Sequence, residues 1–363
     1  MKQILPAVMM LAAPTMGLAQ DKPGIRLSNL DRTVRPGDDF YEFATGGWQK
    51  SHPLPPAYSR FGSFDQLQED NNKRINTILS DLLKKQYKAG TTERKLSDFY
   101  KLAMDSVRRN NDGVAPVKPL LDEMEAARTL DALRQLQLKY AYFGYGVPMG
   151  CFFGADEKNS SMNILNIYQG GLTLGLKEYY LDNDAATVAI REAYRGHIAK
   201  MFRLFGFTEA QADAKRDAIF RFETSVALIS KSRTELRDPQ ANYNKMTLKE
   251  FKENYPNIPL EAMVQAEGVK EAYIQEMVVG QPSFMAGIDK LTAVLTADDL
   301  RALMEWDAIM SATSYLSDDV QAANFEFFGK VMRGRQEDYP RWKRVTSQVD
   351  NQFGEALGKM YCA

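Results

Sequence analysis

The protein has 363 residues, of which 44% are hydrophobic and 11% aromatic, a length that suits about two ordinary domains with a sizeable core. Its 46 Lys and Arg residues are balanced by 47 Asp and Glu residues, which gives a formal charge of -1. This balance argues against nucleic-acid binding, which depends on neutralising many phosphates, and the composition excludes the disordered, collagen-like and disulfide-scaffold classes.

The N-terminus has the pattern of a secretory signal. Lys2 gives a basic start, residues 4–13 form an apolar stretch, and residues 17–19 (Gly-Leu-Ala) match a small-x-small cleavage site. The stretch is interrupted by proline and is shorter than the roughly 20 residues that span a bilayer. We expect a cleaved signal at residues 1–19, a mature domain at residues 20–363, a secreted or periplasmic location and no membrane span. A buried N-terminal helix is the alternative.

The segment DDFYEFATGGW, which begins at Asp38, predicts a short helix. Asp38 or Asp39 can cap its first turn. Phe40 and Phe43 would pack on one face, and Gly46 would end the helix in the left-handed conformation. These features give the segment a complete structural interpretation.

The segment RFGSFD places an arginine and an aspartate at the start of a predicted long helix. The guanidinium of Arg60 offers a planar fork that matches a carboxylate, and Asp65 could hold that fork in a bidentate pair. Such a clamp could receive the terminal carboxylate of a peptide. An ordinary ion pair at the helix terminus is the alternative, and the residues taken without context favour it.

Apolar residues recur at intervals of three and four over most of the chain, which predicts amphipathic helices. The predicted helices cover residues 63–85, 92–108, 130–143, 186–205 and 209–231, and residues 283–360 again have the pattern of long helices.

Two short stretches interrupt this helical pattern. Residues 147–155 and 161–168 are partly β-branched or aromatic and lie on either side of a polar segment, which predicts a small hairpin. A polar join follows at residues 237–244, and no repeat of about 34 residues appears. We therefore predict a mainly α fold, a multi-helical lobe with a small β-hairpin.

Metal chemistry is limited because the chain contains two histidines and two cysteines. His52 and His197 are too far apart for an H-E-x-x-H helix, and no cysteine cluster is present. We expect His52 to be solvent-exposed in a loop and His197 to be a surface or half-buried helix residue, neither with a catalytic role. Cys151 and Cys362 can form a disulfide only if their α-carbons lie within about 7 Å. We predict no metal site and no catalytic residue in this chain.

Short sequence blocks stand in a recognisable order along the chain. They are VRPGDDFY with GGW, SRFGSFD, GLTL with EYYL, RDP with YNKMT, RWKR, and GEALGKMY. This ordered set, from about Leu30 to Tyr361, resembles the N-terminal part of the neprilysin and endothelin-converting enzyme family of zinc metalloendopeptidases. Any single block is weak, whereas the order is specific.

The resemblance implies a two-lobed metallopeptidase in which a helical lobe encloses the chamber and restricts substrates to peptides. In that family the arginine and aspartate of the R-[FY]-G-x-F-D block, here Arg60 and Asp65, help bind substrate near its C-terminal carboxylate. The family's zinc ligands and catalytic residues belong to its C-terminal half, and none of them is present here. Zinc is therefore expected in the full-length family enzyme and not in this chain.

We expect this chain to be a truncated N-terminal region of a secreted zinc metalloendopeptidase that is inactive alone. Its expected partners are a peptide substrate and the missing C-terminal catalytic domain, and no nucleic acid. A natively short chain that regulates a full-length relative is a further hypothesis. The alternative from another class is a non-catalytic periplasmic helical binding module for peptides or glycans, although the lack of a helical repeat and of a lipidation cysteine counts against its glycan form.

Overall fold

The computed structural model describes residues 26–362, so the predicted signal at residues 1–19 lies outside the described residues. The chain divides into two compact units, which meet between Pro55 and Pro56. The prediction of a mainly α fold with a small hairpin is confirmed. None of the helices in residues 26–362 combines the length and the apolar composition that a membrane span requires.

The first unit is built on helix α1 (Phe40–Ser51), which packs against the short 3-10 helix η1 (Leu27–Asn29). The side chain of Asp39 accepts a hydrogen bond from a backbone N–H in the first turn and therefore caps α1, as predicted. The rings of Phe40 and Phe43 lie 6.3 Å apart on one face of the helix.

The prediction that Gly46 ends this helix in the left-handed conformation is wrong, because Gly46 and Gly47 lie inside α1. A β-carbon on Gly47 would lie 2.4 Å from the carbonyl oxygen of Ser28, and one on Gly46 would lie 2.8 Å from the β-carbon of Asp31. The glycine pair therefore lets the segment before the helix cross it at close range.

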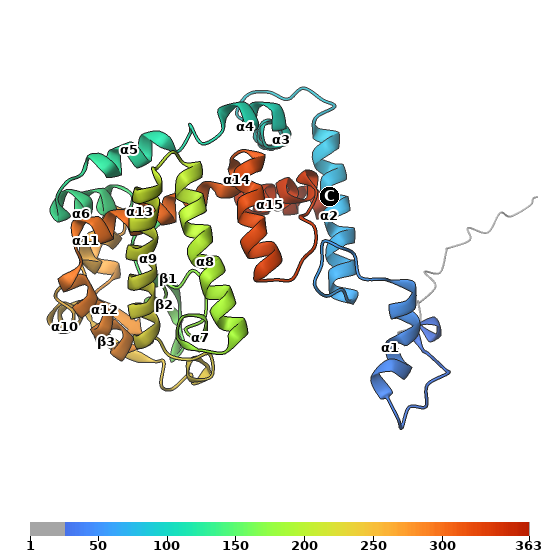
Figure 1. The fold of residues 1–363 in the computed structure, drawn as a ribbon, viewed down its shortest axis with the longest axis horizontal. Coiled ribbons are helices and arrows are strands. Elements are labelled where there is room, and N and C mark those ends of the chain that lie inside the picture. The colour runs from blue at the N-terminus through green and yellow to red at the C-terminus, as the bar shows by residue number, and fades with distance from the viewer. Residues whose placement is uncertain (1–25, 363) are drawn as a thin grey trace, which may run out of the picture. The chain divides into compact units, whose positions relative to one another are not determined.

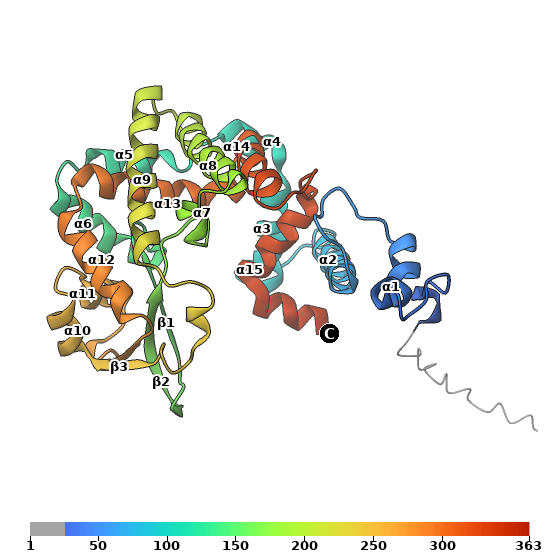
Figure 2. The ribbon, with the colours of Figure 1, turned by 60° about the horizontal axis from the view of Figure 1, so that its bottom comes forward.

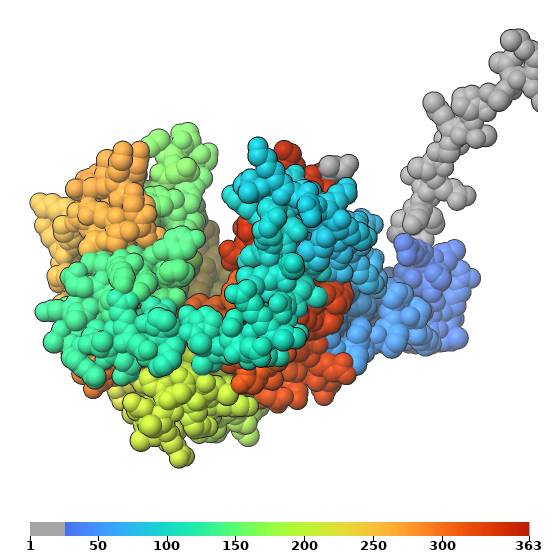
Figure 3. Space-filling model, turned by 90° about the horizontal axis from the view of Figure 1, so that it is seen from above, coloured from blue at the N-terminus to red at the C-terminus, as the bar shows by residue number. Residues whose placement is uncertain are grey.

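In the second unit, three helices from its two ends pack together. They are α2 (Ser63–Leu82), α3 (Thr92–Met104) and α15 (Arg341–Cys362), and α4 (Ser106–Asp112) follows α3 and contacts α14 (Asp318–Asn324). Leu79, Leu96 and Val349 are buried in the core that α2, α3 and α15 share. In the space-filling view the cyan surface of α3 adjoins the red surface of α15 (Figure 3).

The predicted helix over residues 92–108 is two helices in the structure. Asp105 separates α3 from α4, and its side chain accepts a hydrogen bond from the N–H of Arg108 at 3.0 Å. Because an aspartate that caps a new first turn competes with continuation of the previous helix, the apolar periodicity alone did not reveal the break.

The largest core lies between α8 (Ala185–Leu204), α9 (Glu209–Ile229) and α13 (Ala297–Ala312), where Tyr194 and Trp306 are fully buried (Figure 1). Further helices surround this core. They are α5 (Lys118–Ala126), α6 (Leu130–Lys139), α7 (Glu178–Leu181), α14 (Asp318–Asn324), the π-helix η6 (Phe325–Val331) and the 3-10 helix η5 (Thr313–Tyr315). Two further 3-10 helices lie outside this core: η2 (Ala141–Phe143), which contacts α11 (Leu260–Ala266), and η3 (Glu235–Arg237).

The predicted hairpin is present and belongs to a larger sheet. Its strands β1 (Met149–Asp156) and β2 (Asn159–Gln169) are antiparallel, and β2 also pairs in parallel with β4 (Glu276–Val279). Strand β3 (Asn244–Thr247) completes the order β1-β2-β4-β3. Figure 2 shows the two long strands β1 and β2 side by side. Sequence analysis missed β3 and β4 because four-residue strands are too short to show a clear alternation.

A second core covers the sheet. It includes buried side chains of Ile167 on β2, Met277 on β4 and Phe284 on α12. The covering elements are α10 (Leu248–Asn254), α11 (Leu260–Ala266), the 3-10 helix η4 (Glu271–Tyr273) and α12 (Pro282–Val294).

The expectations for the histidines need correction, and the cysteines are unpaired. His197 is 4% exposed on α8 rather than at the surface, and its ring stacks on that of Phe327 with centroids 5.1 Å apart. His52 is half-buried where α1 ends, and its ring stacks on that of Trp48. Cys151 and Cys362 are both free and exposed.

Candidate functional site

Arg60 and Asp65 lie on either side of the point where α2 begins. Arg60 is exposed in the loop before the helix, and Asp65 is on the first turn, with Gly62 as the N-cap residue. The Asp65 carboxylate accepts a hydrogen bond from the N–H of Gly62 at 2.9 Å. Asp65 therefore closes the turn that joins the loop to the helix, which is a role that capping residues often take.

The expected ion pair between Arg60 and Asp65 is absent from the described residues, whether as a bidentate clamp or as an ordinary helix-terminus pair. Asp65 contacts the backbone instead, and the guanidinium of Arg60 has no ion-pair partner within residues 26–362. The guanidinium donors of Arg60 are thus not engaged by a carboxylate of the described residues, while Asp65 shapes the turn beside Arg60.

The loop that carries Arg60 rests on a buried polar cluster. Lys343, on the first turn of α15, is 5% exposed and donates a hydrogen bond to the hydroxyl of Tyr58 at 2.6 Å. Lys343 also pairs with the carboxylate of Glu69, to which Tyr58 donates. We call Tyr58, Glu69 and Lys343 the lysine cluster.

The pKa values within the lysine cluster follow from these contacts. Burial would raise the pKa of Glu69, but the hydrogen bonds from Lys343 and Tyr58 outweigh it and hold the pKa of Glu69 below its ordinary value. Burial, together with the neighbouring Glu69, raises the pKa of Tyr58 well above the ordinary value of a tyrosine. The cluster therefore contains an ionised carboxylate and a protonated phenol around neutral pH.

A fully buried carboxylate lies in the main core. Glu223, on α9, is 3% exposed. It accepts hydrogen bonds from the hydroxyls of Thr173 at 2.5 Å, Tyr180 at 2.7 Å and Tyr194 at 2.8 Å. Burial raises the pKa of Glu223 to about 7, even though the three hydroxyls act in the opposite direction. We call these four residues the hydroxyl cluster.

The hydroxyl cluster explains two of the sequence blocks. Thr173 belongs to GLTL and Tyr180 to EYYL, so both blocks are bound to the same carboxylate on α9. Beside the cluster, Asp307 lines a pocket of about 400 Å³ and accepts a hydrogen bond from the N–H of Gly146 at 2.7 Å. Burial raises the pKa of Asp307 to about 6. Sequence reasoning missed Glu223 because it stands in an ordinary amphipathic helix.

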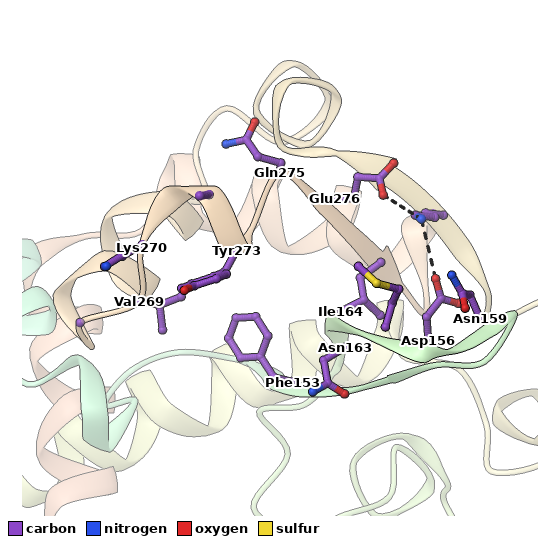
Figure 4. A pocket seen from close by; sticks show the side chains of 14 residues that line it. Phe153, Asp156, Asn159, Asn163, Ile164, Val269, Lys270, Tyr273, Gln275 and Glu276 are labelled. Carbon is purple, nitrogen blue, oxygen red and sulfur yellow. Dashed lines mark ion pairs between the residues drawn. The ribbon is translucent and has the colours of Figure 1, made fainter.

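A pocket of about 840 Å³ opens beside the hairpin (Figure 4). Phe153 of β1 and Tyr273 of η4 face one another at one end of it. At the other end Lys245 pairs with Glu276 at 2.8 Å and with Asp156 at 3.7 Å. Because Lys245 satisfies both carboxylates, this pocket offers apolar walls and no unpaired acid for general acid–base chemistry.

The described residues do not fit a zinc site. Within residues 26–362, no group of three or more His, Cys, Asp or Glu side chains is placed to hold a metal ion, whereas a catalytic zinc needs three protein ligands. Burial lowers the pKa of His197 to about 4, so its ring is neutral at pH 7, and aromatic side chains surround it. The zinc chemistry of the resembled family therefore has no ligand set in this part of the chain.

Comparison with known proteins agrees with the sequence resemblance. The sequence model of peptidase family M13 matches residues 36–363. Endothelin-converting enzyme 1 of Homo sapiens is 28% identical over 347 residues, which cover 92% of this chain and 44% of that protein. The related enzyme of Locusta migratoria, an endothelin-converting enzyme homolog, is 27% identical over 358 residues. This chain thus spans about half the length of the curated relatives it matches.

Solved structures with the same fold are also found. The zinc metalloprotease Zmp1 of Mycobacterium tuberculosis, in complex with an inhibitor, matches with a TM-score of 0.87 and 27% identity over 93% of this chain and 51% of that chain. PepO from Lactobacillus rhamnosis matches with a TM-score of 0.77 and 22% identity over 90% of this chain and 51% of that chain, which is evidence for the fold alone.

Proposed function

Because the chain belongs to peptidase family M13, we propose that it forms the N-terminal, substrate-enclosing region of a secreted zinc metalloendopeptidase that cleaves peptides. In this proposal the helical lobe limits access to the chamber, and Arg60 binds substrate near its C-terminal carboxylate. Asp65 contributes by fixing the turn at Gly62, next to the arginine.

The observation that carries this proposal is the state of Arg60. Its side chain is exposed, it has no ion-pair partner among the described residues, and it stands on a loop held by buried contacts. A guanidinium that is free of intramolecular partners keeps its bidentate geometry available for a peptide carboxylate. Within this family, such a placement supports recognition of a free peptide C-terminus.

The chemistry of bond cleavage would come from residues that this chain does not contain. Relatives such as Zmp1 are zinc metalloproteases, and a bound zinc would supply an activated water in the complete enzyme. Since no ligand set fits zinc within residues 26–362, we propose that the pure 363-residue chain does not hydrolyse peptides. Peptide cleavage by this chain that is sensitive to a chelator would contradict the proposal.

The carboxylate role is tested by titrating the isotope-labelled chain with two peptides of identical sequence, one with a free C-terminus and one amidated. We expect the free acid to shift the NMR signals of the Arg60 Nε and the Gly62 amide, and the amide to shift them far less. Arg60→Ala should abolish the difference, whereas Arg203→Ala, which changes another exposed arginine, should not. Equal shifts with both peptides, or no shift at millimolar peptide, would overturn the assignment.

The proposed location has its own test. The pattern at residues 1–19 supports secretion to the periplasm or the exterior. N-terminal sequencing of the protein from its native source should begin at Gln20, and a start at Met1 would contradict cleavage. The alternative of a non-catalytic peptide or glycan-binding module is not favoured, because the family match covers residues 36–363.

A further inference from the structure

The loop before α2 is tied to distant parts of the chain by two buried cations. Lys343 donates to the hydroxyl of Tyr58, which lies two residues before Arg60, and pairs with Glu69 on α2. Its Nζ atom lies 4.6 Å from the centroid of the Tyr58 ring. The ammonium group of Lys343 therefore contacts the loop before Arg60, at Tyr58, and the helix after Arg60, at Glu69.

A second cation fixes the beginning of the same loop. Arg335 is 9% exposed, and its Nε donates to the carbonyl oxygen of Ala57 at 2.9 Å. Its guanidinium lies 3.9 Å from the centroid of the Tyr339 ring, and the Nζ of Lys343 lies 3.8 Å from the same centroid. The Tyr339 ring thus contacts both cations, so the contacts of Arg335 and of Lys343 with the loop share one aromatic side chain.

On the other side of Arg60, the hydrogen bond between the Gly62 N–H and Asp65 closes the turn. The ring of Phe61 packs against that of Tyr58 with centroids 5.1 Å apart. The backbone around Arg60 is consequently held at residues 57, 58 and 62, while the Arg60 side chain projects without a partner among the described residues.

We propose that Lys343 is a positioning residue for Arg60, which holds the carboxylate-binding loop in one orientation relative to α2. This inference rests on the proposed function, in which Arg60 binds the substrate carboxylate. Lys343 belongs to the RWKR block, so the proposal also gives that block a reason to accompany SRFGSFD in the sequence.

The chemistry of the cluster favours positioning over simple stabilisation. Burying an ion pair is costly, and replacing both of its partners with apolar side chains of similar size often leaves a core equally stable. What an apolar side chain lacks is direction, because it cannot bind a hydroxyl and a carboxylate at fixed angles at the same time. Lys343 uses its donors on two groups from two segments, which fixes the angle between the loop and the helix.

The loop-holding part of the inference is tested by hydrogen exchange on the full chain. Lys343→Met should make the amides of residues 57–62 exchange about tenfold faster or more, since the loop would open locally. Lys359→Met, on the exposed side of the same helix, is the matched control and should leave these amides unchanged. Tyr58→Phe, which removes only the hydroxyl, should give a smaller increase in exchange rate in the same segment. This variant keeps the test available if Lys343→Met fails to fold.

The positioning part is tested by the same pair of free-acid and amidated peptides. Among folded variants, Lys343→Met and Tyr58→Phe should weaken binding of the free acid by about tenfold and about threefold, with little effect on the amide. A residue that only stabilises the fold would lower the melting temperature and leave this ratio unchanged.

The two proposals fail in different ways. If the wild-type chain does not discriminate between the two peptides, the role of Arg60 is wrong, whatever hydrogen exchange shows. If the wild-type chain discriminates and Arg60→Ala abolishes the difference, but both cluster variants keep it and exchange at residues 57–62 is unchanged, the positioning role of Lys343 is wrong while the function of Arg60 stands.

Discussion

The lysine cluster and the hydroxyl cluster each hold a glutamate against tyrosine hydroxyls, with Glu69 half-buried and Glu223 fully buried. The two clusters differ in whether a cation is present. Glu69 has Lys343 as an ion-pair partner, whereas Glu223 has three hydroxyls and no cation among the residues the structure describes. The pKa of Glu69 lies below its ordinary value, and that of Glu223 is raised to about 7. Similar hydroxyl contacts therefore accompany pKa shifts in opposite directions.

This difference indicates how each cluster responds to change. The lysine cluster needs its cation, because Glu69 would otherwise be a poorly compensated charge in a mostly buried place. The hydroxyl cluster can take up a proton instead, so it tolerates the absence of a cation but depends on pH. The lysine cluster joins the RWKR block to the loop before α2, whereas the hydroxyl cluster joins the neighbouring GLTL and EYYL blocks to α9. Only the lysine cluster lies next to the proposed substrate-binding loop.

The largest expected effect is the loss of the cation. Lys343→Met should lower the free energy of unfolding by about 3 kcal/mol at pH 7, because Glu69 is left without its charge partner. Adding Glu69→Gln should recover part of this loss, which urea unfolding of the single and double variants would measure. Lys359→Met should stay within about 0.5 kcal/mol of the wild type. A full loss that persists in the double variant would show that packing rather than charge is responsible.

The next effect is a difference in pH dependence. The folded pKa of Glu223, about 7, is above its ordinary value of 4.5, so its contribution to stability is fully present below pH 4.5 and is lost as pH rises through 7. Between pH 5 and 8 the free energy of unfolding of the wild type should fall by about 2–3 kcal/mol relative to that of Glu223→Gln. The folded pKa of Glu69 is lowered, so the wild type relative to Glu69→Gln should stay flat over this window. If the free energies of unfolding of the wild type and of Glu223→Gln changed with pH in parallel, the proposed difference between the clusters would be wrong.

His197 opposes this trend and must be separated from it. Its folded pKa of about 4 is below the ordinary 6.5, so its contribution is present above pH 6.5 and is lost as pH falls through 4. The free energy of unfolding of His197→Phe minus that of the wild type should be about 2 kcal/mol larger at pH 5 than at pH 7.5. Thermal or urea unfolding at the two pH values tests this, and an unchanged difference would mean that the imidazole titrates normally.

The smallest effects come from single hydroxyls. Tyr58→Phe and Tyr180→Phe should each lower the free energy of unfolding by about 1–2 kcal/mol, since each removes a hydrogen bond to a half-buried or buried carboxylate. The cost for Tyr58 should be constant from pH 6 to 8, because Glu69 stays ionised, whereas the cost for Tyr180 should grow through pH 7 as Glu223 ionises. Urea unfolding of both variants at three pH values would measure these costs. A cost that grows with pH for Tyr58→Phe and stays constant for Tyr180→Phe would contradict the assignment of the two clusters.

Features set by local periodicity were predictable from the sequence. The helices over residues 63–82, 185–204 and 209–229 follow from long apolar stripes, and the hairpin follows from its flanking polar turn. The helix break at Asp105 was not predictable in this way, since a capping aspartate and an ordinary surface aspartate look the same in a stripe.

Features set by contacts between distant segments were not predictable. Tyr58 and Lys343 are separated by 285 positions in the sequence, and nothing in either local pattern indicates that they meet. The burial of His197 depends on Phe327 and Trp306, which come from other helices. Arg60 and Asp65 were identified through the family resemblance, but their spacing suggested an ion pair that the fold replaces with a backbone cap.

The pairing of β2 with β4 has a consequence for how the chain folds. The hairpin joins neighbouring segments and can form early, whereas β4 enters about 110 residues later and runs parallel to β2. A parallel partner this remote requires the intervening helices to close a long loop first, and such closure is slow. During synthesis, the edge of β2 that receives β4 therefore stays open until residues 276–279 have been made, and it is the place where we expect a chaperone to bind.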